Sequence, residues 1–181
     1  MQSPWKTAFI TTGVFWIFSA MPAYAENQTP TINANVEFRV SSPDLKKING
    51  ARVLVISDNG TIMANGLTNS EGIWDTKLQV TQDPRFSNIR EMGTVTAIVF
   101  AQGFNEEVVF EVPVYPNSIQ PVSLVPIQPG KRNEPVKWLG NLHRHDIGRM
   151  VDRYANETGL AKQPGVSGTF GNAAWSPSIK R

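Results

Sequence analysis

Two closely spaced turns that end in glycine constrain the fold of this chain more than any other feature. The stretch "SDNGTIMANGLTNSEGIWDTKL", residues 57 to 78, contains Asp58-Asn59-Gly60 and, about a dozen residues on, Asn69-Ser70-Glu71-Gly72. Such residues tolerate the positive φ angles that tight turns demand, and short apolar segments flank both turns. The stretch therefore predicts three short strands that the two turns join into a meander.

The segments near these turns have strand patterns. Val36, Phe38 and Val40 alternate with charged residues, so we expect them to face inward from a half-buried strand. Residues 51 to 56, "ARVLVI", form a nearly continuous apolar run, which is typical of a strand covered on both faces or of one near the centre of the sandwich. In the strand after the second turn, the alternation places Trp74 on the inward face.

The downstream sequence supplies the remaining strands. Residues 94 to 100 and 119 to 126 have strand patterns, and Val108 to Val114 alternate between them. Pro113 at an outward position predicts an edge strand or a bulge. The longer connection from 81 to 93 leaves room for a helical turn. About seven short strands without a convincing helix between them predict an antiparallel β-sandwich rather than βαβ units.

The N-terminus has the pattern of an export signal. Lys6 precedes an apolar segment from Ala8 to Ala20, Pro22 follows it, and "AYA" at 23 to 25 is a small-x-small cleavage site. The segment is shorter than the about 20 residues that a membrane-spanning helix needs. We expect cleavage after Ala25 and a mature chain without a membrane span; retention of the segment as an uncleaved anchor is the alternative.

The chain contains no cysteine. This excludes disulfides, zinc-thiolate sites, thiol nucleophiles and a lipid-bearing cysteine after the signal. Because small secreted eukaryotic domains commonly use disulfides, we expect a bacterial exported protein that is secreted, periplasmic or held in the cell envelope.

The order of residues resembles that of the carboxypeptidase regulatory-like domains. Residues 49 to 78 are similar to the core signature of that family, which is a strand, a glycine turn, a second glycine turn and a strand. Residues 101 to 104, "AQGF", resemble a later turn, and residues 122 to 127 resemble the closing strand. The matching core positions are Gly50, Ala51, Val53, Val55, Gly60, Thr68, Gly72 and Leu78.

The resemblance covers residues 34 to 128 and implies a seven-stranded transthyretin-like, Ig-like β-sandwich. Domains of this family are usually non-catalytic. They support neighbouring enzymes, or act as binding or spacer modules in envelope proteins. The connection over residues 81 to 92 is longer than the compact pattern of the family needs.

Residues 129 to 181 form a C-terminal extension of different composition. Residues 26 to 130 carry seven Lys and Arg against 11 Asp and Glu, whereas residues 131 to 181 carry nine against four, together with both histidines. A linker rich in Pro, Gly and charge begins the extension, and a flexible Gly/Ser/Pro-rich tail ends it. This asymmetry indicates a body and a tail with different roles.

One short amphipathic helix is expected within the extension, at about 146 to 158. Asp146 is a suitable N-cap and Gly159 fits the position after the helix end. The expected apolar stripe consists of Ile147, Met150, Val151 and Tyr154.

The candidate partner-binding residues lie in this extension. Arg149 and Arg153 stand one helical turn apart, and the hypothesis is a basic contact surface for an anionic polymer or protein partner. The alternative is the solvated face of a helix that packs on the sandwich. Trp175 is a candidate anchor that becomes ordered on binding, and the alternative is that it packs on the body.

His143 and His145, with Asp146 next to them, are the constellation that comes closest to a metal site. A catalytic zinc site needs three protein ligands and an open position, and no third histidine is present. We therefore expect no metal or other cofactor, and we place both histidines among the candidate partner-binding residues.

The expected function is that of a secreted, non-enzymatic module. It would bind or support an exported protein or envelope polymer, not nucleic acid, and the C-terminal extension would give the specificity. No Gly-x-Ser-x-Gly elbow or phosphate-binding glycine loop is present. The acidic residues Glu106, Glu107 and Glu111 are expected to line a solvated strand edge.

Two other functions stay open. One is a small metal-dependent or transthyretin-like hydrolase, although the chain ends Ser178-Ile179-Lys180-Arg181 rather than in the Tyr-Arg-Gly-Ser typical of hydroxyisourate hydrolases. The other is a carbohydrate-binding module, for which an exposed aromatic residue would be needed.

Overall fold

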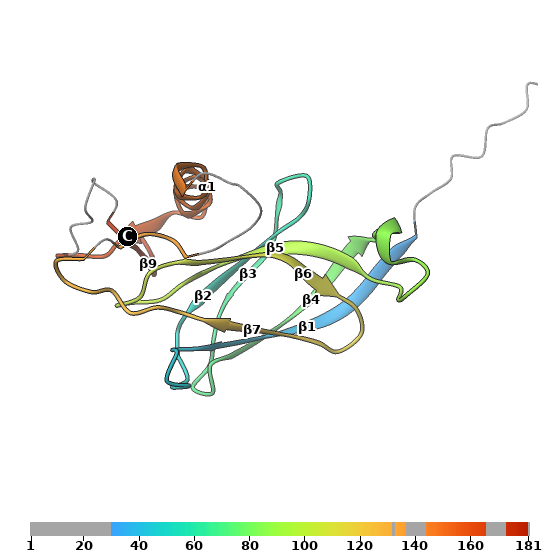
Figure 1. The fold of residues 1–181 in the computed structure, drawn as a ribbon, viewed down its shortest axis with the longest axis horizontal. Helices are drawn as coiled ribbons and strands as arrows, with labels where there is room; N and C mark the ends of the chain where they lie inside the picture. The colour runs from blue at the N-terminus through green and yellow to red at the C-terminus, as the bar shows by residue number, and fades with distance from the viewer. Residues whose placement is uncertain (1–29, 132, 137–143, 166–172, 181) are drawn as a thin grey trace, which may run out of the picture.

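The computed structural model describes residues 30–131, 133–136, 144–165 and 173–180 (Figure 1). The predicted signal segment, with its cleavage site after Ala25, and the candidate residue His143 lie outside the described residues. Within those ranges, no helix is long and apolar enough to cross a membrane.

Seven strands form two sheets that face each other across a buried core (Figure 1). The three-stranded sheet has the order β4-β1-β7, with the bounds Ile73–Thr81, Thr31–Ser41 and Ser118–Ser123. The four-stranded sheet has the order β3-β2-β5-β6, with the bounds Ile62–Leu67, Arg52–Ile56, Gly93–Phe100 and Glu107–Val114. The prediction of an all-β, sandwich-like fold is confirmed.

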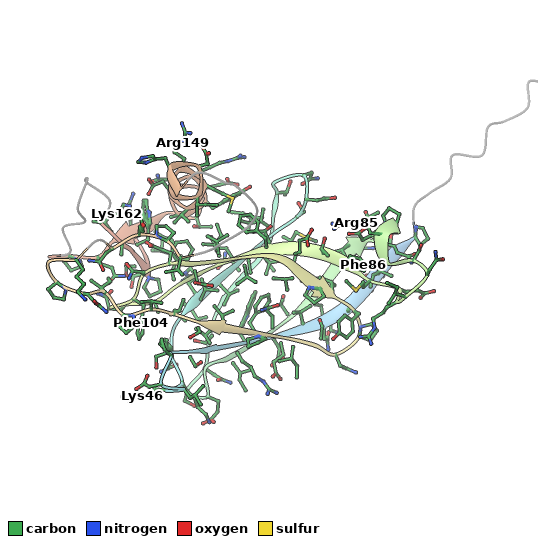
Figure 2. All side chains as sticks on the ribbon, in the orientation of Figure 1. Lys46, Arg85, Phe86, Phe104, Arg149 and Lys162 are labelled. Atoms are coloured by element: carbon green, nitrogen blue, oxygen red, sulfur yellow. The ribbon has the colours of Figure 1, made fainter. Side chains whose placement is uncertain are left out.

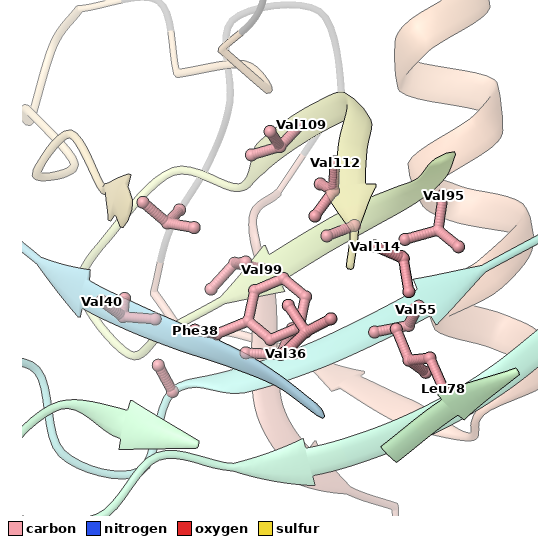
Figure 3. Packing of buried hydrophobic residues seen from close by; sticks show 14 of the residues in the cluster. Val36, Phe38, Val40, Val55, Leu78, Val95, Val99, Val109, Val112 and Val114 are labelled. Atoms are coloured by element: carbon pink, nitrogen blue, oxygen red, sulfur yellow. The ribbon is translucent and has the colours of Figure 1, made fainter. Parts of the chain in front are cut away.

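The first core lies between the two sheets (Figure 3). Val36, Phe38 and Val40 of β1 point into it and are at most 2% exposed, as their alternation predicted. Trp74 of β4 also faces inward and stacks on Phe38, with ring centroids 5.7 Å apart. Gly66 of β3 leaves room for this indole, because a Cβ there would lie 2.1 Å from Trp74 Nε1.

A second core lies on the other face of the four-stranded sheet. Val53 and Val55 of β2 face the first core, whereas Leu54 and Ile56 face the second, so the prediction of a strand covered on both faces is confirmed. The elements that cover this face belong to the C-terminal extension. They are α1, β8 and β9, at Arg144–Glu157, Leu160–Lys162 and Trp175–Ile179.

The connections between strands differ from the predicted meander. β2 and β3 form the expected hairpin across the turn that ends at Gly60. The turn that ends at Gly72, however, carries the chain from the four-stranded to the three-stranded sheet, where β4 pairs with β1. The meander was wrong because a turn specifies a reversal of the chain and not the strand with which the next segment pairs.

Two further expectations about the sheets were wrong. β7 pairs with β1 in parallel, so the sandwich is not wholly antiparallel. The described residues contain nine strands rather than seven, because β8 and β9 form a third, two-stranded sheet. Neither feature has a local signal, since pairing direction depends on segments far apart in the chain.

β6 is the last strand of its sheet and contains a bulge, as Pro113 predicted. Glu111 within it has a φ of 53°. As a result the regular alternation is interrupted: Val109 and Val112 face the first core, whereas Val108 faces the second. The long connection before β5 contains a short 3-10 helix, Pro84–Phe86.

The helix of the extension begins earlier than expected. α1 starts at Arg144, so Asp146 lies in its first turn and the N-cap prediction was wrong. A carboxylate in the first turn still interacts favourably with the helix dipole. Gly159 follows the helix with a φ of 70°, as predicted for the residue after its end.

Candidate functional site

The exposed side of α1 carries the candidate basic surface. His145, Arg149 and Arg153 are all exposed, and their spacing of four residues aligns them in one stripe along the helix. We call these three residues the α1 stripe. Arg149 Nη2 lies 2.5 Å from Asp146 Oδ1, and the Arg153 guanidinium lies 5.1 Å from the centroid of the Tyr154 ring. The stripe therefore contains two arginines that are held in place by neighbours on the same helix.

The opposite side of α1 fixes the orientation of this stripe. Ile147, Val151 and Ala155 are buried in the second core, against the apolar outer face of the four-stranded sheet. The Tyr154 hydroxyl donates a hydrogen bond to the Gly60 carbonyl at 2.9 Å, which ties the helix to the tip of the β2–β3 hairpin. Arg149 consequently points away from the body of the protein (Figure 2).

Trp175 lies beneath this surface and not on it. It is 4% exposed, in β9, and its indole N–H donates to Asp152 Oδ1 at 2.7 Å. Lys162 Nζ lies 3.0 Å from the same carboxylate oxygen and 3.8 Å from the centroid of the indole ring. Trp175 is thus ordered within its own chain, where it joins α1, β8 and β9.

Glu106 is the buried acid of this junction. It is 3% exposed, and its Oε1 accepts a hydrogen bond from the backbone N–H of Trp175 at 2.5 Å. Burial is the main cause that raises the pKa of the Glu106 carboxyl above its ordinary value, while the hydrogen bond from Trp175 acts in the opposite direction. A carboxyl whose pKa is raised in the folded state links the stability of the fold to pH.

The expected solvated acidic edge was therefore wrong for Glu106 and Glu107, which are both buried. Val136 donates its backbone N–H to the Glu106 carbonyl at 2.9 Å and forms a parallel bridge with Glu107, so the extension covers the start of β6. Only Glu111 of the three is exposed, and it pairs with Arg85 Nη1 at 2.9 Å. Local sequence could not reveal this, because the covering segment lies some distance downstream.

Gln163 was not anticipated from the sequence. It is 3% exposed, and its side-chain oxygen accepts the backbone N–H of Gly103 at 2.8 Å. Its side-chain nitrogen donates to the carbonyls of Ala101 at 3.1 Å and Trp175 at 2.9 Å. A single glutamine thereby joins the body to β9, and its only sequence signal is a polar residue within an otherwise unremarkable Gly/Pro-rich tail.

The hollow inside this junction is too small for a ligand. It has a volume of about 10 Å³ and is lined by Glu106, Asp152, Lys162 and Trp175 among others. That volume is enough for about one water molecule. The junction therefore serves to hold the extension, and the exposed side of α1 stays a candidate contact surface.

The structure also places the candidate metal ligands. His145 and Asp146 lie together at the start of α1, where the Asp146 carboxylate pairs with Arg149. Across the described ranges, no group of three or more His, Asp or Glu side chains is arranged to hold a metal ion. A three-ligand site that includes His145 is thus not assembled from these residues.

The solved structures that are similar to this chain include three with TM-scores below 0.5. No family model matches the chain, and no curated protein matches it. One similar structure is the Bacillus anthracis TIE protein, with a TM-score of 0.37 and 14% identity over 51% of this chain and 16% of that chain. A second is a variant of the catechol 1,2 dioxygenase of Acinetobacter radioresistens, with a TM-score of 0.44 and 13% identity over 60% of this chain and 57% of that chain.

A third is an intradiol ring-cleavage dioxygenase from Tetranychus urticae, with a TM-score of 0.29 and 13% identity over 49% of this chain and 53% of that chain. The chain thus spans less than two thirds of the length of each neighbour. Two of the three are dioxygenases, so the expectation that this chain is not an enzyme has no support from these neighbours. TM-scores below 0.5 assign no activity to it.

Proposed function

We propose that this protein is an exported module with a carboxypeptidase regulatory-like, transthyretin-like sandwich, and that it binds another exported or cell-envelope component. In this proposal the C-terminal extension gives the specificity, and the contact surface is the α1 stripe. The observation that carries the proposal is the alignment of His145, Arg149 and Arg153 on the exposed side of a helix whose other side is buried.

The rigidity of the helix supports a binding role. A surface that is already ordered loses less conformational entropy when a partner binds than a flexible segment does. Here the second core, the Tyr154 hydrogen bond and the Trp175 junction all fix α1 before any partner arrives. The two arginines are therefore presented at a constant spacing.

The charge of the extension supports an anionic partner. Residues 131 to 181 carry nine Lys and Arg against four Asp and Glu, in contrast to the acidic excess of residues 26 to 130. Charge complementarity at an exposed surface acts on association rate and specificity, and salt weakens it. An acidic protein surface or an anionic envelope polymer would fit this description.

The test is a retention experiment with a charge-reversed variant. The purified protein is immobilised and exposed to envelope and exported fractions of the source cell, and retained components are identified and eluted with increasing salt. Arg149→Glu combined with Arg153→Glu should reduce retention of a specific partner about tenfold or more, since rim charges act mainly on association. Circular dichroism should show an unchanged fold, because both side chains are exposed.

A matched control reverses two cations far from α1. Lys46 and Lys47 lie in the loop after β1, and Figure 2 shows Lys46 and Arg149 on opposite sides of the molecule. Lys46→Glu combined with Lys47→Glu makes the same change in net charge, so it should leave retention at the wild-type value. Equal retention by both double variants would exclude the α1 stripe as the contact surface.

A further inference from the structure

β4 presents a long unpaired edge. It consists of nine residues without a proline, and β1 pairs with it along its whole length on one side. On its other side, no strand among the described ranges pairs with it, since β4 ends the three-stranded sheet. Such an edge is a template for pairing with another extended segment.

The backbone groups at this edge belong to the odd-numbered residues. The Val40 N–H donates to the Gly72 carbonyl at 2.8 Å, and the register places these two residues opposite each other, next to the Arg39–Ile73 pair, so this is a hydrogen-bonded position of the β1–β4 ladder. Hydrogen-bonded and non-hydrogen-bonded pairs alternate along an antiparallel ladder. The even-numbered residues of β4 therefore direct their N–H and C=O groups to β1, whereas Asp75, Lys77 and Gln79 direct theirs to the free edge.

The side chains at the same positions leave two charges without an opposite partner. Asp75 and Lys77 are exposed, and neither forms an ion pair with a described residue. Asp75 lies directly opposite Glu37 of β1, and the cation beside Glu37 is Arg39. Like charges directly across a ladder are unfavourable, so a further cation beside Asp75 would be stabilising.

A second copy of the chain supplies that cation in one register. If two β4 strands pair antiparallel about a two-fold axis at Thr76, Asp75 of each copy faces Lys77 of the other, and two opposite-charge pairs form. On the inward face, Trp74 then lies opposite Leu78 of the second copy. A shift of the axis by one residue places either Asp75 opposite Asp75 or Lys77 opposite Lys77, which disfavours both neighbouring registers.

We propose that two copies of this protein associate edge to edge through β4, with the two-fold axis at Thr76. The two three-stranded sheets become one continuous sheet, and the contact is isologous, as in most soluble homodimers. A lysine on an edge strand ordinarily discourages pairing with other chains. Here Asp75 lies two residues before Lys77, so the charges of this edge are complementary to those of a second copy of the same edge in the antiparallel register.

The experiment measures mass by sedimentation velocity over a concentration series. The wild-type protein should shift from the mass of one chain to twice that mass as its concentration rises. Asp75→Lys and Lys77→Asp should each weaken dimerisation, by about tenfold to a hundredfold, because both cross-strand pairs change from opposite to like charge. The double variant with both exchanges should recover the wild-type dissociation constant.

Mixing the two single variants gives the sharpest outcome. One variant then presents two lysines at these positions and the other two aspartates, so an equimolar mixture should form a heterodimer at concentrations at which each variant alone is mostly monomeric. Native mass spectrometry with one variant isotopically labelled identifies the heterodimer. A wild type that is monomeric at all concentrations, or a dimer that none of these exchanges alters, would overturn the proposal.

Discussion

Replacing Trp175 by alanine should release the C-terminal extension from the body. The indole is 4% exposed and joins α1, β8 and β9, and truncation of a buried tryptophan costs about 3–5 kcal/mol. Loss of the contact between the Lys162 ammonium and the ring adds about 0.5–1 kcal/mol. Losing the hydrogen bond from the indole N–H to Asp152, which keeps its ion pair with Lys162 at 3.0 Å, adds about 1 kcal/mol. The expected loss in the free energy of unfolding is therefore about 5–6 kcal/mol.

That loss is large compared with the stability of a domain, which is about 5–15 kcal/mol. Urea unfolding followed by circular dichroism, with linear extrapolation, measures it. Trp175→Phe is the matched control: it keeps most of the packing and loses the hydrogen bond to Asp152, at a cost of about 1–2 kcal/mol. Amide hydrogen exchange adds a local readout. Relative to the wild type, the alanine variant should show a larger increase in the exchange rate of the α1 amides than of the β5 amides.

Two results would refute this reasoning. If Trp175→Ala unfolds within about 0.5 kcal/mol of the wild type, the indole does not hold the extension, because that is the range of surface substitutions. If the alanine and phenylalanine variants lose the same free energy, the hydrogen bond rather than the packing determines the stability of the junction.

Three further substitutions test other parts of the structure. Gly72→Ala should cost about 2–3 kcal/mol or more in urea unfolding, since Gly72 has a φ of 72° and an added Cβ would lie 2.5 Å from the Val40 carbonyl oxygen. Gly66→Ala should displace the Trp74 indole, seen as a shift in near-ultraviolet circular dichroism, because the Cβ would lie 2.1 Å from Trp74 Nε1. Glu106→Gln tests linkage: burial raises the pKa of Glu106 in the folded state, so the protonated acid stabilises the fold, and this contribution is complete below the ordinary glutamate pKa. The stability of the wild type relative to Glu106→Gln should therefore fall as the pH rises through the raised pKa; a difference that is independent of pH would contradict the assignment.

The strands could be predicted because their signals are local. Alternation with a period of two placed Val36, Phe38 and Val40 in the core, and the run from residues 51 to 56 indicated a strand with two buried faces. Pro113 indicated the bulged edge strand, and the apolar stripe with a following glycine indicated α1. Each of these patterns reports the side of a strand or helix on which a residue lies. The spacing of the residues along the chain determines that side.

Of the candidate site, the sequence located the helix and its two arginines but not their support. Arg149 and Arg153 share a side because they are four residues apart, a spacing that any helix converts into one stripe. The buried positions of Trp175, Glu106 and Gln163 require β8, β9 and the start of β6 to meet. A local sequence pattern cannot predict such a contact between segments that are distant in the chain.

The sequence by itself determined the set of elements and the side that each one buries, because propensity, turn chemistry and periodicity act over a few residues. Only the tertiary structure decided that the chain crosses between sheets after Gly72, that β7 pairs with β1 in parallel, and that no strand of the described ranges pairs with the outer edge of β4. Those outcomes depend on which apolar faces bury each other most completely. The pairing of the strands and the packing of the sheets therefore depend on all the elements together, and no single element determines them.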